Sequence, residues 1–423
     1  MRPNTCGIAL LLLLALAAAP AQPAWAQTYT VLHTLTGPPD GAVPGPLIGD
    51  EQGTFYGTTR FAGLANCGEG TCGTVFKIDS AGNETVLFDF PGGNFGTNPL
   101  AGLARDLAGN LYGTTQGNGS IGGGSVVFKI DPKGEETVLF VAGTISQGCC
   151  LDSPVALDEE GNVYGMSPFA GDEECSYGDG LGCGTLFKLS PGGKFTLLHT
   201  FHGKDGSEPE GGVVLDAKGT IYGTAYFGGK PGFCHPSLGD YQEDGCGTIY
   251  KVDTSGKFTV LHTFAGPGDG AAPLGLTIDS AGNLYGITQW GGDDKHYYDH
   301  LYGYGTVFKL DASGKFSVLF TFTPKTTHQN LYASHLLRDS KGNLYGLESA
   351  LSGGCLFMLD PQGNFTDLYN FQGFGEGADG NGPTGIVFGP DGDFYGSMLI
   401  GGFGESQLCD PNGCGSVFHL SLR

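Results

Sequence analysis

Apolar and polar residues alternate along short stretches of this chain, and Gly, Pro, Asp or Asn residues separate the stretches. One series predicts four strands, Asn98–Arg105, Asn110–Thr115, Ser125–Ile130 and Glu136–Val141. A tight turn joins the first two strands, and a glycine-rich loop, Gln116–Gly124, joins the second to the third. The pattern therefore predicts an up-and-down antiparallel sheet of four short strands.

This unit recurs along the whole chain. The stretch around the second strand, with a Tyr-Gly pair inside it, occurs at Glu51–Thr59, Asp106–Thr115, Asp158–Ser167, Asp216–Ala225, Asp279–Thr288, Asp339–Glu348 and Gly389–Met398. The third and fourth strands recur as well, for example in GTVFKIDSAGNETVLFDF at Gly73–Phe90 and GTIYKVDTSGKFTVLHTF at Gly247–Phe264. Recurrence of one unit predicts a repeat architecture in place of several unrelated domains.

The phase of the repeat predicts how the architecture closes. The last copy, Gly415–Arg423, stops after a third strand, whereas Thr28–Leu35 reads TYTVLHTL and matches a fourth strand. A linear array would leave both ends as unpaired edges, and a ring would pair them. We therefore predict an all-β fold: a single seven-bladed β-propeller of four-stranded antiparallel blades over residues 27–423, closed by pairing the N-terminal strand with the C-terminal strand.

In such blades the short D-x-x-G turns share one face of the ring. The second-to-third loops and the blade-to-blade connections share the opposite face, and they hold the long, irregular and cysteine-bearing segments. Binding and catalytic residues are concentrated on variable loops held by a rigid scaffold. We therefore expect any functional site on the long-loop face.

Composition narrows the class of protein. Glycine contributes 78 of 423 residues, which fits an all-β protein with many turns, because aromatic and β-branched residues are also frequent. Lys and Arg total 20 against 43 Asp and Glu, a net charge of −23, which argues against nucleic acid and anionic membrane surfaces as partners. We see no motif for a cofactor, so none is expected, and we expect a monomer.

The N-terminus has the features of a secretory signal peptide over residues 1–26. Arg2 precedes an apolar segment, Ile8–Ala19, and Ala24-Trp25-Ala26 resembles a cleavage site. We expect cleavage near Ala26/Gln27, no retained membrane span, and a secreted or extracytoplasmic protein.

The combination of YGTT, GG, GTVFK and VLHTF, with connections such as Phe264–Gly270, resembles the GloVer-type tandem repeat of exported bacterial proteins. Members are described as choice-of-anchor proteins because they end in varied surface-sorting tails. The resemblance covers essentially the whole chain after the signal peptide, and it implies export and a repeat architecture but no known activity. This chain shows no sorting tail, which favours a released protein over an anchored one.

Cysteines in the long loops pair by position. Cys72, Cys183, Cys246 and Cys414 occupy one repeat position, and each has an upstream partner in its own loop. In an exported chain these predict four local disulfides, Cys67–Cys72, Cys175–Cys183, Cys234–Cys246 and Cys409–Cys414. Cys6 lies in the signal peptide, and for the remaining three cysteines we favour a Cys149–Cys150 bridge with a buried free Cys355; the alternative is three free thiols.

Two departures from the repeat suggest a binding site. The loop Trp290–Tyr304 concentrates residues that can stack on sugar rings and bond to hydroxyl groups, namely Trp290, Asp294, His296, Tyr297, Tyr298, Asp299 and His300. His296 and His300 are weak candidates for metal ligands. The alternative is that these aromatic residues only pack the loop in place.

The second departure is His335. The six equivalent positions hold only glycine or proline: Pro46, Gly102, Pro154, Gly212, Gly275 and Gly385. On an innermost strand an imidazole could project into the central channel, where it would suit a general base. His335 is thus the first catalytic suspect, although a local packing role is the alternative.

Three hypotheses of function remain open. The leading one is an exported binding propeller whose long-loop face contacts a glycan or a surface protein. The second is an extracellular hydrolase or lyase acting on carbohydrates or lactones at the channel mouth. The third is a purely structural envelope protein. Sequence alone leaves enzymatic activity undecided, with binding favoured over catalysis.

Overall fold

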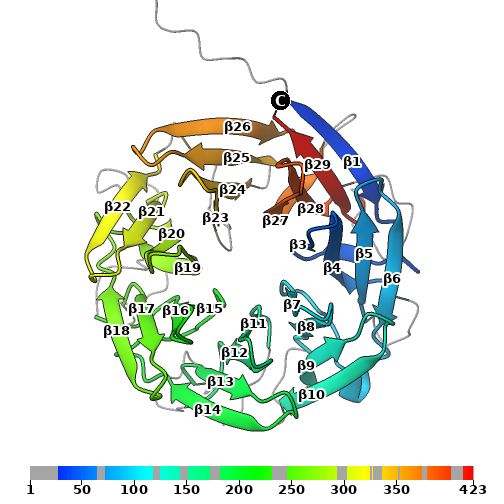
Figure 1. Cartoon of the computed structure of the whole chain (residues 1–423). Helices are drawn as coiled ribbons and strands as arrows, with labels where there is room; N and C mark the ends of the chain where they lie inside the picture. Colours follow the sequence, from blue (N-terminus) through cyan, green and yellow to red (C-terminus); the bar gives the residue numbers. More distant parts are fainter. Residues whose placement is uncertain are drawn as a thin grey trace, which may run out of the picture.

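Seven antiparallel sheets surround a common axis in the computed structural model (Figure 1). It describes residues 27–63, 72–117, 124–142, 151–171, 182–230, 245–292, 303–323, 326, 336–350, 353–373, 379–401 and 413–422. Within these ranges the one helical segment is a short 3-10 turn, η1 (Gly93–Phe95), next to blade 2. None of the described helices could cross a membrane. The predicted all-β propeller of seven blades is confirmed.

The strands follow one another from the axis outward in each blade. Blade 1 contains β2 (Ala42–Pro44), β3 (Ile48–Gly49), β4 (Thr54–Phe61), β5 (Thr74–Asp79) and β6 (Glu84–Asp89). Blades 2 and 3 contain β7 (Ala104–Arg105), β8 (Leu111–Thr114), β9 (Ser125–Ile130), β10 (Glu136–Ala142), β11 (Ala156–Leu157), β12 (Val163–Ser167), β13 (Thr185–Leu189) and β14 (Phe195–Thr200). Blades 4 and 5 contain β15 (Val213–Leu215), β16 (Ile221–Ala225), β17 (Thr248–Val252), β18 (Phe258–Thr263), β19 (Ala271–Ile278), β20 (Leu284–Trp290), β21 (Thr306–Leu310) and β22 (Phe316–Thr321).

Blades 6 and 7 complete the ring. They contain β23 (Leu337–Arg338), β24 (Leu344–Ala350), β25 (Gly353–Leu359), β26 (Phe365–Phe371), β27 (Asn381–Phe388), β28 (Phe394–Ile400), β29 (Ser416–Ser421) and β1 (Thr28–Thr34). The order β1-β29-β28-β27 shows that the N-terminal strand supplies the outer strand of blade 7, as predicted. In Figure 1 the blue first strand lies beside the red last strand.

The innermost strand of blade 2 is shorter than the sequence predicts, whereas those of blades 5 and 7, β19 and β27, each have eight residues. The predicted strand Asn98–Arg105 is reduced to β7, whose two residues pair with Tyr112 and Leu111. At the start of the predicted strand, the Asn98 amide donates to the Cys72 carbonyl of blade 1 at 3.2 Å. The third strand of blade 2, Ser125–Ile130, has the predicted bounds.

The glycine of each Tyr-Gly pair allows a third-strand aromatic ring to lie against the second strand. A Cβ atom at Gly286 would lie 2.4 Å from Cζ of Phe308, and one at Gly346 would lie 2.4 Å from Cζ of Phe357. Both phenylalanine side chains are completely buried. Since a Cβ cannot approach a ring so closely, the Tyr-Gly repeat is a packing requirement of the close-packed core.

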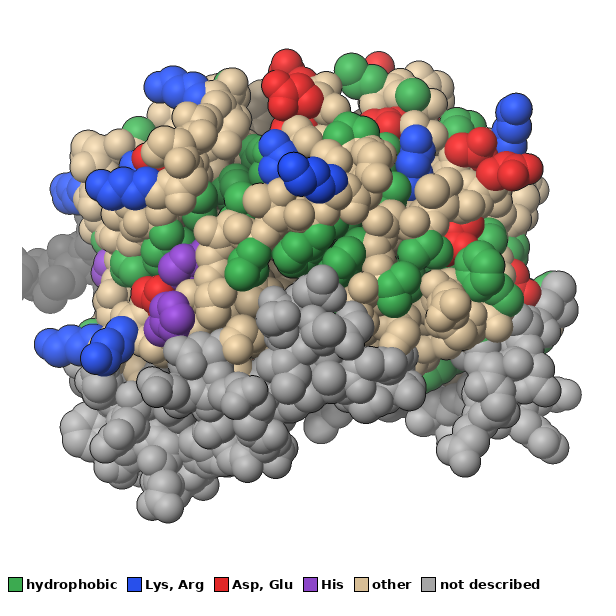
Figure 2. Space-filling model, turned by 90° about the horizontal axis from the view of Figure 1, so that it is seen from below, with side chains coloured by type: hydrophobic (Ala, Val, Ile, Leu, Met, Phe, Trp, Pro, Cys, Tyr) green, Lys and Arg blue, Asp and Glu red, His purple; other side chains and the backbone are tan. Residues whose placement is uncertain are grey.

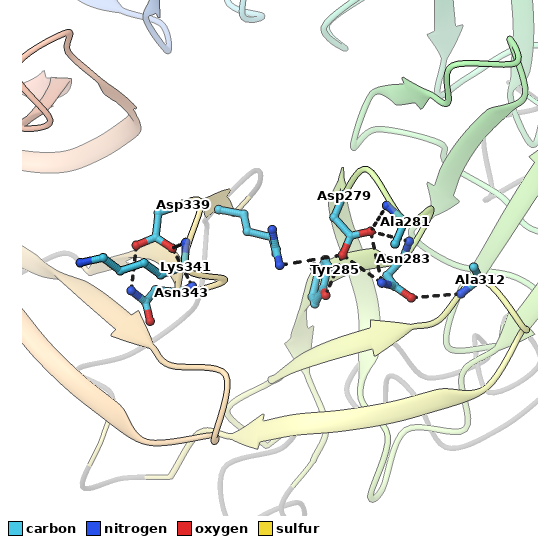
Figure 3. A network of polar contacts seen from close by, with 9 residues as sticks. Asp279, Ala281, Asn283, Tyr285, Ala312, Asp339, Lys341 and Asn343 are labelled. Atoms are coloured by element: carbon cyan, nitrogen blue, oxygen red, sulfur yellow. Dashed lines mark hydrogen bonds and ion pairs between the residues drawn. The ribbon is translucent and has the colours of Figure 1, made fainter.

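The D-x-x-G turns are closed by an aspartate that also holds the repeated tyrosine. Asp106 accepts hydrogen bonds from the Asn110 backbone amide at 2.8 Å and from the Tyr112 hydroxyl at 3.1 Å. Partial burial opposes ionisation, but these hydrogen bonds outweigh it and lower the pKa of Asp106. Asp279 and Asp339 make the same two kinds of hydrogen bond, to Asn283 and Tyr285 and to Asn343 and Tyr345. Figure 3 shows both turns, with Asn283 and Tyr285 beside Asp279 and Asn343 beside Asp339.

Adjacent blades are joined on the outside by stacked aromatic rings. His199 of blade 3 lies parallel to Phe258 of blade 4, with ring centroids 3.6 Å apart. Five junctions carry such a pair: Phe140–Phe195, His199–Phe258, His262–Phe316, Phe320–Phe365 and Tyr369–Tyr29. At the other two junctions a glutamate, Glu84 or Glu136, replaces the second ring.

The two faces of the ring differ. We call the face with the D-x-x-G turns the turn face, and the face where second strands end and first strands begin the loop face. In the side view of Figure 2, Lys, Arg, Asp and Glu side chains of described residues gather along the upper rim of the ring. In blades 1 to 6 the turn between the third and fourth strands also carries an aspartate or serine whose side chain accepts a hydrogen bond from a backbone amide of the turn. The polar side chains of these turns therefore stabilise the strand connections of the blades.

Candidate functional site

Trp290 is the one candidate binding residue of the predicted aromatic loop, Trp290–Tyr304, that falls within the described residues. It ends β20 at the loop face and is half-buried. The remaining candidates lie outside the described residues and stay predictions: Asp294, His296, Tyr297, Tyr298, Asp299, His300 and His335. The weak metal candidates, His296 and His300, are among them.

Trp290 packs against two aromatic residues of blade 4. Its ring lies 5.5 Å from that of Tyr226 at 71° and 6.2 Å from that of Phe227 at 40°. The Tyr226 hydroxyl donates a hydrogen bond to Oε1 of Gln289, whose side chain is buried. We call Tyr226, Phe227 and Trp290 the aromatic cluster. Because each of the three remains partly exposed, the cluster offers aromatic surface at the loop face as well as packing.

The positions equivalent to His335 form the innermost contacts between blades. A Cβ at Gly385 would lie 3.0 Å from Cβ of Pro46, and one at Gly212 would lie 2.8 Å from Cγ of Pro154. A Cβ at Gly102 would lie 3.8 Å from Pro46 and 4.0 Å from Pro154. Small residues recur here because neighbouring blades meet around the axis, so a histidine at this position is a large departure.

A group of polar residues from four blades lies at the loop face close to these contacts. Arg60 belongs to β4, and Nη2 of Arg60 donates to Oε1 of Gln116 in blade 2 at 3.4 Å. Asp152 and Glu210 precede the innermost strands of blades 3 and 4. We call Arg60, Gln116, Asp152, Glu208 and Glu210 the polar cluster.

The acids of the polar cluster resist ionisation. Burial raises the pKa of Asp152 to about 6, against the opposing effects of its own backbone amide and the Arg60 charge. Solvent reaches Glu210, yet the surrounding protein desolvates its carboxylate and, with the charges of Asp152 and Glu208, raises its pKa to about 8. The site therefore holds both an acid that is mostly ionised at neutral pH and one that is mostly protonated.

Two members of the polar cluster have unused hydrogen-bonding capacity. Nε of Arg60 and Oδ1 of Asp152 are buried and make no hydrogen bond. The same is true of Oγ of the neighbouring Ser153. Buried polar atoms without hydrogen-bond partners are uncommon in folded proteins, and functional sites are one place where they occur. The cluster adjoins the aromatic cluster, because the Tyr226 amide donates to the Glu208 carbonyl at 3.1 Å.

Sequence reasoning missed the polar cluster. One repeat position holds a polar or aromatic residue in four blades, namely Arg60, Gln116, Tyr226 and Gln289. In two other blades the same position holds Pro168 and Leu399. A comparison of that position across blades, like the one that singled out His335, would have shown its polar character. Asp152 and Glu210 carry no comparable signal, because their raised pKa values arise from burial in the folded ring.

The cysteines divide into two groups. Cys72, Cys183, Cys246 and Cys414 are buried at the third-strand entrances, and their predicted partners lie outside the described residues. The predicted pairs therefore stay predictions, as does the Cys149–Cys150 bridge. Cys355 is a buried free thiol, as predicted, and donates to Oε2 of Glu348 at 3.3 Å.

Comparisons with known proteins agree with this architecture. The model of the Gloeobacter/Verrucomicrobia repeat family matches residues 22–234 and 175–346, so the chain belongs to this family. No curated protein sequence matches significantly.

Solved structures share the fold. A streptogramin B lyase is 15% identical, covers 95% of this chain and 100% of its own, and gives a TM-score of 0.58. An inactive variant of virginiamycin B lyase from Staphylococcus aureus with quinupristin is 13% identical, with 94% and 100% coverage and a TM-score of 0.58. An extracellular domain from a two-component-system protein of B. thetaiotaomicron is 11% identical, with 91% and 39% coverage and a TM-score of 0.54. At these identities the likeness concerns the fold alone.

Proposed function

We propose that this protein is an exported binding propeller that holds a glycan on its loop face. The observation that carries the proposal is the aromatic cluster adjoining a polar cluster with unpartnered donor and acceptor atoms. Partly exposed aromatic rings suit the apolar faces of sugars, while Arg60, Gln116 and the acids can bond to hydroxyl groups. The predicted residues Asp294, His296, Tyr297, Tyr298, Asp299 and His300 follow Trp290 directly and would extend this surface.

Export is part of the proposal. The signal peptide over residues 1–26, cleavage near Ala26/Gln27 and the four loop disulfides all fit an oxidising, extracytoplasmic compartment. Family membership and the fold of an extracellular bacterial domain support this location. A surface protein is the alternative partner on the same face.

Replacing Trp290 with alanine is expected to weaken glycan binding at least tenfold, because it removes the stacking surface between blades 4 and 5. The test screens wild type and Trp290→Ala on one glycan array, followed by calorimetry on the strongest hit. Leu107→Ala is the matched control, because Leu107 is a fully exposed apolar residue in a D-x-x-G turn on the opposite face. The proposal would be abandoned if no glycan bound, or if both variants bound as wild type does.

The second candidate is a hydrolase or lyase acting on carbohydrates or lactones. It is favoured by Asp152 and Glu210, whose pKa values of about 6 and 8 suit a base and an acid at neutral pH. If His335 projects toward the same point, it would join them. A screen of lactones and oligosaccharides with wild type and Asp152→Asn tests this candidate, and turnover that the substitution leaves unchanged would exclude a role for Asp152.

A further inference from the structure

Blade 7 departs from the other blades at its turn face. Asp391, Asp393 and His419 each offer one ligand atom, and these atoms lie within 4.8 Å of one another. Nε2 of His419 is 3.1 Å from Oδ2 of Asp393 and 3.8 Å from Oδ2 of Asp391. One imidazole nitrogen and two carboxylate oxygens form a donor set that divalent transition metals accept.

The three residues replace a different arrangement in the other blades. The position of His419 holds a lysine in five blades: Lys77, Lys129, Lys188, Lys251 and Lys309. Lys129, for example, lies with Nζ 5.8 Å from the centre of the Tyr112 ring, where its charge would repel a cation. In blade 7 the lysine is absent and the imidazole of His419 stacks on the Tyr395 ring, with ring centroids 4.6 Å apart and an interplanar angle of 27°.

The acids are rearranged in the same blade. Gly389 occupies the position of the usual turn aspartate, and Asp391, two residues later, accepts the Tyr395 hydroxyl at 3.0 Å instead. Asp393 takes the position of Asn110 and is buried. Asp391 is exposed, but the Tyr395 hydroxyl and the Asp393 amide, at 3.1 Å, give it outer hydrogen bonds of the kind that orient metal-ligating carboxylates.

A cavity adjoins the group between blades 6 and 7. Its volume is about 530 Å³, within the range of small-ligand sites, and Asp393 belongs to its lining. The walls are mostly apolar, with Tyr345, Phe388 and Phe394 among them. Arg338 also lines the cavity, and its Nε is buried without a hydrogen-bond partner.

We propose that Asp391, Asp393 and His419 bind a divalent transition metal ion, with Zn²⁺ as the preferred ion, at the edge of this cavity. Three protein ligands leave a coordination position for water or a ligand, and such open sites are typical of zinc centres that act on or hold small molecules. The mostly apolar walls of the cavity would face a small ligand held at that position; Nη2 of Arg338, in the same wall, lies 3.9 Å from Oδ2 of Asp279. This site lies on the turn face, opposite the proposed glycan surface, and does not depend on it.

Calorimetric titration of the tag-free exported protein with ZnCl₂ tests the site. We expect one Zn²⁺ per chain, and at least a tenfold loss of affinity in both Asp393→Asn and His419→Lys. Both substitutions install residues that other blades carry at these positions, so the blade is expected to fold. Urea unfolding of each variant checks this.

His262→Phe is the matched control. It removes a His–Asp pair of 3.2 Å in blade 4 and installs the aromatic residue that other blades carry there. Its Zn²⁺ affinity should equal that of wild type. The proposal is overturned if Zn²⁺ does not bind at 100-fold molar excess, or if folded Asp393→Asn and His419→Lys retain wild-type affinity. Glycan binding measured in the same variants should stay unchanged. This measurement therefore distinguishes failure of the proposed Zn²⁺ site from failure of the proposed glycan-binding function.

Discussion

Removing residues 27–35 is expected to abolish cooperative folding of the ring. β1 supplies the outer strand of blade 7 and pairs with β29 from Thr28↔Ser421 to Thr34↔Ser416. Tyr29 stacks on Phe418 at 5.4 Å and belongs to the aromatic junction with blade 6. The deletion would expose both the edge of β29 and the core beneath it.

Far-UV circular dichroism and urea unfolding would measure the effect, with a chain that begins at residue 27 as the control. The control should unfold in one cooperative transition, and the deletion should show either no transition or a greatly lowered midpoint. Addition of a synthetic peptide of residues 27–36 should restore part of the transition. Equal midpoints for the deletion and the control would contradict the assignment of β1 to blade 7.

Glu136→Phe is expected to stabilise the protein at alkaline pH. Glu136 occupies the position of Phe195 and Phe258, and both of its carboxylate oxygens are buried without hydrogen-bond partners. Burial raises its pKa to about 7, above the ordinary value of about 4.5. The native state then holds the proton more tightly than the unfolded state, so this contribution is complete below pH 4.5 and is lost as the pH rises through 7.

Glu136→Phe removes the loss of stability that ionisation of Glu136 causes. It also places a phenyl ring opposite Phe88 at the junction between blades 1 and 2, as at the five junctions with stacked rings. Because Glu136 is only partly shielded from water, we expect the free energy of unfolding to increase by about 1–2 kcal/mol at pH 8 and by less at pH 4.5. Urea unfolding at both pH values measures the difference. Glu135→Gln, at an exposed neighbour, should change little. A stability difference that is equal at both pH values would contradict the linkage.

The periodic parts of the fold could be predicted because each blade repeats the same local chemistry. Ser125–Ile130 has the predicted bounds, and the pairing of Thr28–Thr34 with the last strand followed from the phase of the repeat. The innermost strand Asn98–Arg105 was predicted too long. Alternation in sequence reports burial on two faces, but it does not report how closely neighbouring blades approach the axis, where Gly102 meets Pro46 and Pro154.

The candidate site could be predicted only in part, for a physical reason. Trp290 was recognised as a departure from the repeat, and its contacts with Tyr226 and Phe227 place it on a loop-face surface. Asp152 and Glu210 are separated in sequence and belong to different blades, and only folding brings their charges close enough to raise a pKa. Comparison of repeats identifies unusual residues, but it does not identify which of them converge.

The closed ring is the central claim, because the inner rim of the loop face and the cavity between blades 6 and 7 both depend on it. Thr28 and Ser421 are directly opposed across β1 and β29. In the double variant Thr28→Cys/Ser421→Cys, oxidation should form a disulfide between positions 28 and 421 of one chain, detectable by peptide mass spectrometry without reduction. The pair Thr28→Cys/Ser255→Cys, with Ser255 on the turn of blade 4, should form no such link. Absence of the link between positions 28 and 421, or links only between chains, would contradict a ring that is closed within one chain.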